Sequence, residues 1–189
     1  YENDGSQSFT QRVITNAADS AQSVFAIDVD GDGDVDALSA SYYDDTVAWY
    51  ENDGSQSFTE RVITESADFA WSVFAIDVDG DGDVDALSVS FYDDTVAWYE
   101  NGCGAHAASA APTPRPTVFC TSVSFSERVI TNAADGARSV FAIDVDGDGD
   151  VDALSASYTD DTVAWYENDG SQSLDDARAA RSSRASRSR

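Results

Sequence analysis

The sequence contains no lysine, no methionine and a single histidine, and its 36 aspartate and glutamate residues outnumber its 10 arginines. The formal net charge is −26, and five of the arginines lie in the last twelve residues, which hold no acid. The body that precedes this tail is therefore strongly anionic. Such a surface repels a phosphate backbone, which excludes nucleic acid as a partner of the main body. The same charge predicts that the body gathers cations.

Long apolar runs are also missing, since no stretch of 18 apolar residues occurs, and the sequence predicts no membrane span. The chain opens at Tyr1 inside a repeated motif and shows no charged-then-apolar leader, so we expect a fragment or a processed piece. The only cysteines are Cys103 and Cys120. They could close a local loop in an oxidising compartment or remain two free thiols, and the sequence leaves both open.

Catalytic motifs are absent as well: there is no G-x-S-x-G, no Cys–His pair and no Gly-rich phosphate loop. The sole histidine, His106, has no repeated counterpart. The pairs Asp44-Asp45, Asp93-Asp94 and Asp160-Asp161 could suggest catalytic carboxylates. Adjacent residues in a strand turn point apart and Asp favours turns, so we predict turns there. We therefore expect that the chain is not an enzyme.

What the sequence does have is one unit that occurs three times. Residues 1–49 and 50–98 align without gaps and differ at seven positions. The segment SVFAIDVDGDGDVDALS begins at Ser23, Ser72 and Ser139, so the second spacing exceeds the first by an 18-residue insertion within 102–124. Such a period indicates stacked repeats. We predict one repeat domain over 1–174, with units at about 9–57, 58–124 and 125–174, followed by a disordered Ser/Arg-rich tail at 175–189.

Each unit predicts four short strands. In the first copies these are the apolar run Ser23–Ile27, the alternating segment Asp36–Tyr43, then Thr46–Glu51, and a fourth strand of the type Phe9–Thr15. Four-stranded antiparallel modules of this period are typical of β-propeller blades. The predicted fold class is all-β, with three propeller-type blades in a partial or oligomer-completed propeller. The insertion is rich in Ala, Pro and Thr and is ill-suited to a strand.

Three blades are fewer than the four to eight of a closed propeller. The chain begins with the fourth strand of a blade and ends after the third strand of another, near Tyr166, so the first segment could complete the last blade. The sequence leaves open whether the chain is a piece of a larger ring or whether two or more chains assemble one. For the chain alone we expect a dimer that forms a six-blade ring, or heterogeneous aggregates, rather than a closed monomer.

The acidic loops carry the chemistry. D-V-D-G-D-G-D-V-D occurs three times, with carboxylates at positions 1, 3, 5 and 9, Gly at position 6, and a residue at position 7 whose carbonyl can point inward. Oxygen ligands at this spacing suit Ca²⁺ better than Mg²⁺, which demands a tighter octahedron. Without a cation, each close pair of carboxylates would repel by up to ~4 kcal/mol. We predict three Ca²⁺ sites, at Asp28, Asp30, Asp32, Asp34 and Asp36, at Asp77, Asp79, Asp81, Asp83 and Asp85, and at Asp144, Asp146, Asp148, Asp150 and Asp152.

The loops allow two other interpretations. A helical EF-hand loop, or its dockerin variant, needs helical flanks, and the EF-hand needs a bidentate Glu at position 12. This sequence has Ser39, Ser88 and Ser155 there and strand-forming flanks, so we reject both helical types. The loops could also be acidic turns that only keep the surface soluble, but three identical nine-residue patterns argue against that.

The unit A-I-D-V-D-G-D-G-D-V-D-A-L-S followed by T-V-A-W-Y-E-N-D-G-S-Q-S-F resembles FG-GAP/VCBS repeats, over roughly residues 1–101 and 124–173. The resemblance implies β-propeller blades, as in integrin α-subunit heads, with a Ca²⁺ loop between the first two strands. It implies side-chain ligands at positions 1, 3, 5 and 9 and a carbonyl ligand at position 7. It also implies an extracellular or cell-surface location and a role in binding or adhesion.

Further repeated and variable positions could bear on function. Trp49, Trp98 and Trp165 recur at one strand position, which is typical of inter-blade core and less so of a sugar-stacking platform. Positions that differ between copies mark either a ligand face opposite the Ca²⁺ loops or drift, and they are Ser20/Phe69/Gly136, Gln22/Trp71/Arg138 and Tyr43/Tyr92/Thr159.

Three functions are therefore weighed. The first is a calcium-binding extracellular module or scaffold with a protein or glycan ligand. The second is an accessory propeller of a larger carbohydrate-active enzyme. The third is a non-functional fragment of a repeat array.

Overall fold

The computed structural model describes residues 2–3, 9–102, 106–108, 118–120 and 122–170. The tail at 175–189, Cys103 and most of the insertion lie outside the described residues. Within them every regular element is a strand. The strands are β1 (Glu2–Asn3), β2 (Phe9–Thr10), β3 (Ala21–Ile27), β4 (Asp36–Ser41), β5 (Thr46–Asn52), β6 (Phe58–Thr64), β7 (Ala70–Ile76), β8 (Asp85–Ser90), β9 (Thr95–Asn101), β10 (His106–Ala108), β11 (Val118–Cys120), β12 (Phe125–Thr131), β13 (Ala137–Ile143), β14 (Asp152–Ser157) and β15 (Thr162–Tyr166).

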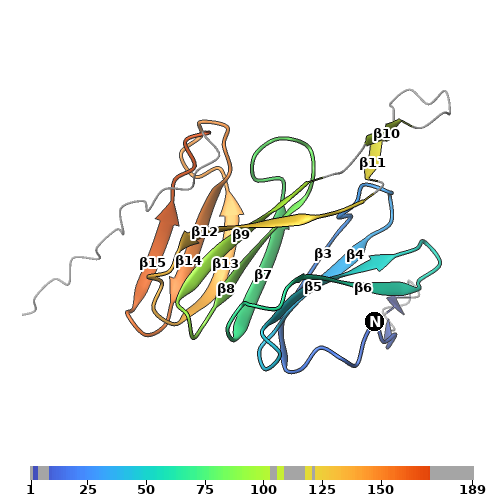
Figure 1. The fold of residues 1–189 in the computed structure, drawn as a ribbon, viewed down its shortest axis with the longest axis horizontal. Coiled ribbons are helices and arrows are strands. Elements are labelled where there is room, and N and C mark those ends of the chain that lie inside the picture. Colours follow the sequence, from blue (N-terminus) through green and yellow to red (C-terminus); the bar gives the residue numbers. More distant parts are fainter. Residues whose placement is uncertain (1, 4–8, 103–105, 109–117, 121, 171–189) are drawn as a thin grey trace, which may run out of the picture.

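Three antiparallel sheets stand side by side in a row (Figure 1). The first has the order β3-β4-β5-β6, the second β7-β8-β9-β12, and the third β13-β14-β15. Each is an up-and-down sheet whose strands follow the chain, as in a propeller blade, and the row does not close into a ring. The all-β, propeller-blade prediction is therefore confirmed.

The first copy of the fourth strand differs from the prediction. Only Phe9–Thr10 of the segment Phe9–Thr15 is a strand, and it pairs with β1. The segment therefore does not complete the third sheet within this chain. Figure 1 shows the reason, because the N-terminus and β15 lie at opposite ends of the row.

The insertion also differs from the prediction. Although its composition is ill-suited to a strand, β10 and β11 pair as a short antiparallel hairpin, with His106 opposite Cys120. Beyond the hairpin the second sheet resumes, since β12 pairs with β9 and places Arg128 opposite Trp98. The insertion thus interrupts the connection between the third and fourth strands without changing their pairing.

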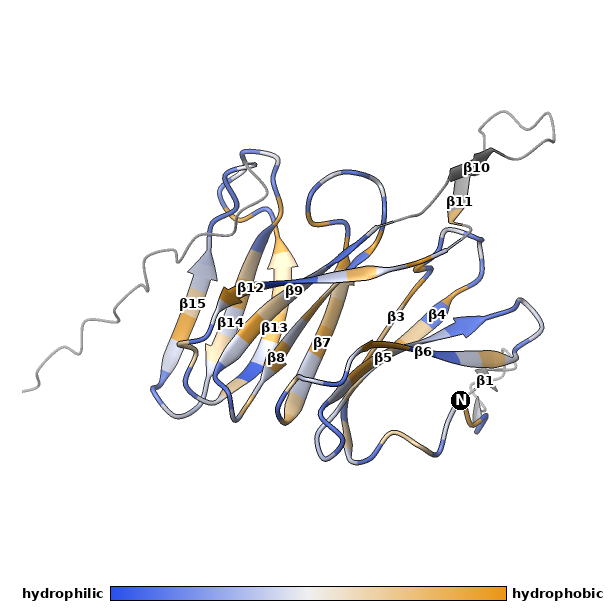
Figure 2. Cartoon of the chain, viewed as in Figure 1, coloured by the Kyte–Doolittle hydropathy of each residue, from blue (hydrophilic) through white to orange (hydrophobic). Residues whose placement is uncertain are grey.

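The core lies between the sheets. Leu38, Val47 and Trp49 of the first sheet pack against the small residues Ala70, Val73 and Ala75 of β7, and the second and third sheets repeat this packing. Trp49 and Trp98 are buried, so the inter-blade core prediction is confirmed for them. Figure 2 shows the apolar residues along β7 and β13, inside the row.

Candidate metal centre

Each acidic loop is held in a tight coil by its own carboxylates. In the first loop, Asp28 accepts hydrogen bonds from the backbone amides of Gly31, at 2.8 Å, and Gly33, at 2.9 Å. Asp30 accepts from the amide of Asp32 and Asp32 from that of Asp34. The second and third loops repeat all four bonds. The coil is therefore a property of the nine-residue sequence itself.

Glycine is required at the sixth position for its backbone conformation. Gly33, Gly82 and Gly149 have φ angles of +101°, +99° and +105°, a region that L side chains rarely adopt. A Cβ atom built on any of them meets nothing within 4 Å. Glycine is therefore required at this position for its φ angle and not because a side chain would lack space.

The ninth aspartate is buried and joins three segments of chain. Asp85 accepts from the amide of Val78 at 2.9 Å through one oxygen and from the amide of Asn101 at 2.8 Å through the other. Asp36 and Asp152 make the equivalent pairs of bonds. This carboxylate thus ties the start of the loop to the end of the third strand of the same blade.

Sequence reasoning missed a residue at this junction. The asparagine that ends each W-Y-E-N segment donates its backbone amide to the ninth aspartate and its side-chain amide to the carbonyl before that aspartate. Asn101 also lies 3.5 Å from the Val29 carbonyl, and Asn168 lies 3.4 Å from the Val78 carbonyl, each in the loop of the preceding blade. The recurrence of this asparagine in all three copies was the available signal.

Carboxylate oxygens converge in each loop. They come from Asp28, Asp30 and Asp32 in the first loop, and the oxygens in each set lie within 4.8 Å of one another. In the second and third loops the sets are Asp77, Asp79, Asp85 and Asp144, Asp146, Asp152. Ligand oxygens around one Ca²⁺ ion lie at 2.3–2.6 Å from it, so oxygens on opposite sides are about 5 Å apart. The three sets fit one such ion each.

The seventh aspartates stand apart from these sets. A Cβ atom built on Gly54 would lie 2.5 Å from a side-chain oxygen of Asp34, and one built on Gly170 would lie 2.6 Å from that of Asp150. These two side chains therefore reach the N-D-G turn. In the second blade, Cys120 Sγ lies 3.9 Å from Asp83. Such placement leaves the backbone carbonyl as the group that position 7 can offer to a loop-centred ion.

Burial and mutual repulsion weaken the acidity of the loops. Burial, with a smaller contribution from neighbouring carboxylates of the same loop, raises the pKa of Asp85 to about 7 and that of Asp30 to about 6. Burial likewise raises the pKa of Asp36 and Asp79. A cation at the centre of the loop would stabilise the ionised form of these carboxylates, which is otherwise costly to reach.

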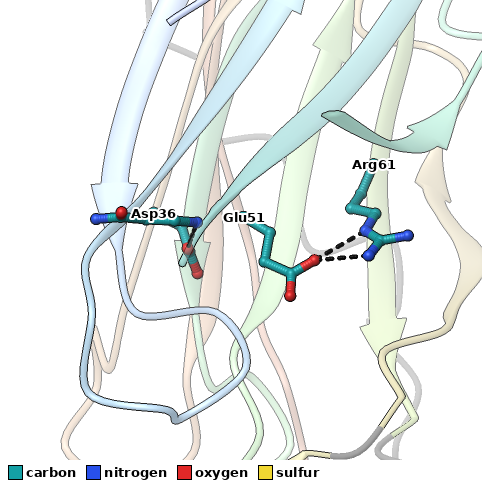
Figure 3. Close-up of polar contacts among 4 residues, drawn as sticks. Asp36, Glu51 and Arg61 are labelled. Atoms are coloured by element: carbon teal, nitrogen blue, oxygen red, sulfur yellow. Dashed lines mark hydrogen bonds and ion pairs between the residues drawn. The ribbon is translucent and has the colours of Figure 1, made fainter. Parts of the chain in front are cut away.

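The structure also places the Asp-Asp pairs and two of the repeated arginines. The Asp-Asp pairs are turns, because Asp45, Asp94 and Asp161 have φ angles of +55°, +56° and +57°. Arg61 donates to Glu51 through two nitrogens, at 2.8 and 2.9 Å, beside Asp36 on the adjacent strand (Figure 3). Arg128 pairs with Glu100 in the same way.

The second cysteine has a definite state. Cys120 is disulfide-bonded, and the only other cysteine of the sequence is Cys103. The backbone amide of Cys120 donates to the Asp30 carbonyl at 2.8 Å, and Cys120 lines a cavity between the first two acidic loops. The insertion therefore contacts the loop region at the boundary of two blades.

The positions that vary between copies gather at the end of the blades opposite the acidic loops. Phe69 stacks on Tyr42 with ring centroids 4.3 Å apart, and Trp71 contacts Tyr42 edge-on. The guanidinium of Arg138 lies 4.6 Å from the ring centre of Trp71 and 4.0 Å from that of Tyr158. Phe69 holds a φ of +56°, where its counterpart in the third blade is glycine. Variation between copies has thus produced a connected aromatic cluster.

One comparison with known proteins, a match to a family model, agrees with this geometry. Within the part of the chain that the structure describes, no helix has the length and apolar character that crossing a membrane would need. Neither the curated proteins nor the solved structures gave a match. The family model described as FG-GAP-like repeat matches residues 28–88, which run from the first acidic loop through the second. Over that stretch the chain is similar to an FG-GAP-like repeat, in agreement with the resemblance drawn from its sequence.

Proposed function

We propose that the chain is a calcium-binding β-propeller repeat module that acts in extracellular binding or adhesion, or as a structural scaffold, and not as an enzyme. The observation that carries the proposal is the threefold occurrence of one loop geometry, in which carboxylate oxygens lie within 4.8 Å of one another. Hard oxygen ligands on a flexible loop select Ca²⁺. The ion would neutralise carboxylates whose burial and proximity raise their pKa.

The metal would serve the fold rather than a reaction. The ninth aspartate connects the loop to the third strand, and the asparagine beside it reaches the preceding loop. An ion held by each loop would therefore fix both the blade and its contact with its neighbour. An accessory propeller of a larger carbohydrate-active enzyme, or a non-functional repeat fragment, would present the same loops.

An extracellular location is supported by the disulfide at Cys120, since disulfides persist in oxidising compartments. A protein or glycan ligand is supported by the aromatic cluster, where Tyr43, Tyr92 and Tyr158 are exposed. Tyrosine offers stacking area and a hydroxyl at low entropic cost. A glycan panel probed with the chain and with a Tyr43→Ala/Tyr92→Ala variant would test this face, and equal signals from both proteins would exclude it.

Calorimetry on the metal-stripped chain tests the calcium proposal. We expect about three equivalents of Ca²⁺, with an affinity in the ~10⁻⁴–10⁻³ M range of extracellular modules. Asp30→Ala, Asp79→Ala and Asp146→Ala, at the third loop position that all three converging sets share, should each remove one equivalent. Asp19→Ala, at an exposed turn position, is the matched control and should leave all three. Binding of zero or one equivalent by the unaltered chain would contradict the proposal.

A further inference from the structure

The row of sheets leaves one half of an inter-blade interface open at each end. On β7 and β13 the residues that face the preceding sheet are buried: Val73 is 4% and Val140 is 5% exposed. Their counterpart on β3, Val24, is 73% exposed. Ala21 and Ala26, on the same side of β3, are also exposed, whereas their counterparts on β7 and β13 are buried. We name Ala21, Val24 and Ala26 the leading face.

The other half is open on the third sheet. Val163 of β15 is 68% exposed, whereas its counterparts Val47 and Val96 are both 0% exposed under the sheet that follows them. Phe141 and Ile143 are exposed too, while Phe25 and Phe74 each contact the phenylalanine of the next blade. Figure 2 shows the apolar segment on β15 at the end of the row. We name Phe141, Ile143 and Val163 the trailing face.

The third sheet also lacks a fourth strand among the described residues. In the first two sheets that strand is FTERVIT or FSERVIT, paired so that its arginine lies opposite the tryptophan of the third strand. The chain holds a third version, FTQRVIT at residues 9–15, whose first two residues pair with β1 and whose last five residues are in no sheet. Docking of this strand on another sheet replaces its short pairing with β1, which has the register of the third-strand pairing in the first sheet. In the same register Arg12 would lie opposite Trp165, beside Glu167.

Chain connectivity allows one partner to fill both openings. The fourth strand of the second sheet ends at Thr131 and is separated by the five residues 132–136 from β13, which begins the next sheet at Ala137. Residues 9–15 are likewise separated from β3 by the five residues 16–20. A second copy that adds residues 9–15 to β15 would therefore bring its β3 onto the trailing face, as the link between the second and third sheets does within the chain.

The turns at this junction already have the matching conformation. Asp94 accepts from the amides of Ala134 and Gly136, through its carbonyl and its side chain, which joins the second sheet to the next turn. Asp161, its counterpart at the open end, has the same left-handed backbone, with φ of +57° against +56°. On the other side Ser20, with φ of +57°, matches Phe69, with φ of +56°. The turns on both sides of the open junction therefore already have the backbone conformation found at the junctions within the chain.

We propose that a second copy of this chain docks here, with its residues 9–15 as the fourth strand of β13-β14-β15 and its leading face on the trailing face. The contact is head-to-tail. When each of two copies makes this contact with the other, their six sheets close into a ring of the usual propeller size. The proposal deepens the proposed function by naming a partner, but it rests on the blade interfaces and not on the metal.

Particle mass in solution tests the docking. Light scattering on the full chain in Ca²⁺ should give twice the mass of the 20.1 kDa chain. Val24→Asp and Val163→Asp should each give the single-chain mass, because each places a charge in the interface. An equimolar mixture of the two variants should return to the doubled mass. In the mixed dimer the unaltered trailing face of the Val24→Asp chain still binds the unaltered leading face of the Val163→Asp chain. Val129→Asp, at a residue 56% exposed on β12, is the matched control and should behave as the unaltered chain.

A charge exchange tests the added strand. Arg12→Glu and Glu167→Arg should each weaken self-association several-fold, and their mixture should restore it, because both contacts then join opposite charges. Circular dichroism of each variant checks that the sheets remain folded. A single-chain mass for the unaltered protein, or a larger mass that Val24→Asp and Val163→Asp do not change, would overturn the proposal. Calcium counting on the same samples separates this failure from failure of the proposed function.

Discussion

Each ninth aspartate accepts from two backbone amides that lie 7 and 16 residues away in sequence. The sequence predicts Asp85 as a metal ligand from its spacing, and its oxygens lie in the converging set of the second loop. Its role in joining strands was not predictable, because the Asn101 amide arrives from a different strand. A carboxylate oxygen has two lone pairs, so one residue can serve the backbone and an ion together.

The raised pKa values give the metal-free protein an unusual pH dependence. Asp85, with a pKa of about 7, and Asp30, with a pKa of about 6, hold protons more tightly in the folded state than in the unfolded one. Their contribution to stability is thus fully present below the ordinary Asp pKa and is lost as pH rises through 6 to 7. We expect the melting temperature of metal-stripped protein to fall between pH 5.5 and pH 8.

In excess Ca²⁺ the direction should reverse, because protons compete with the ion for the same carboxylates. Scanning calorimetry at the two pH values, with and without Ca²⁺, measures both slopes. Asp85→Asn is the informative variant, since it cannot ionise and should flatten the metal-free slope. A melting temperature that rises with pH in the metal-stripped protein would contradict the assignment.

At the scale of strands, the repeat made most of the fold predictable. The runs at Ser23–Ile27 and Thr46–Glu51 lie within β3 and β5, because apolar and β-branched runs between turn residues need little further information. The strand predicted for Asp36–Tyr43 ends at Ser41, since Tyr42 belongs to the turn. The segment Phe9–Thr15 was not predictable in the same way. A strand needs an edge to pair with, and local sequence does not say whether one is near.

A buried valine and an exposed valine provide a matched test of core packing. Val96 is 0% exposed between the second and third sheets, whereas Val62, on β6, is 50% exposed. Val96→Ala removes two buried methyl groups and should lower the free energy of unfolding by about 2 kcal/mol. Val62→Ala should change it by less than ~0.5 kcal/mol. Urea unfolding in Ca²⁺ measures both, and equal losses would mean that the sheets do not pack as described.

At the scale of the whole molecule, charge and topology act together. A net charge of −26 favours expansion through self-repulsion, and the carboxylates are most concentrated in the three loops at one end of the blades. The sequence predicted this asymmetry because the loops repeat. It could not predict which faces stay uncovered, because that depends on how many sheets stand in the row.

Calcium should therefore stabilise the molecule beyond what ionic strength explains. An ion that binds the folded loops far better than the unfolded chain adds about 2.7 kcal/mol for each independent site at a free concentration of 100 times Kd. Sodium chloride at equal ionic strength only screens the repulsion, so it should raise the melting temperature less. Thermal unfolding in Ca²⁺, in chelator, and in chelator with added sodium chloride separates the two effects. If the three curves coincide, the loops are not structural calcium sites; if Ca²⁺ and sodium chloride act equally, the stabilisation is screening alone.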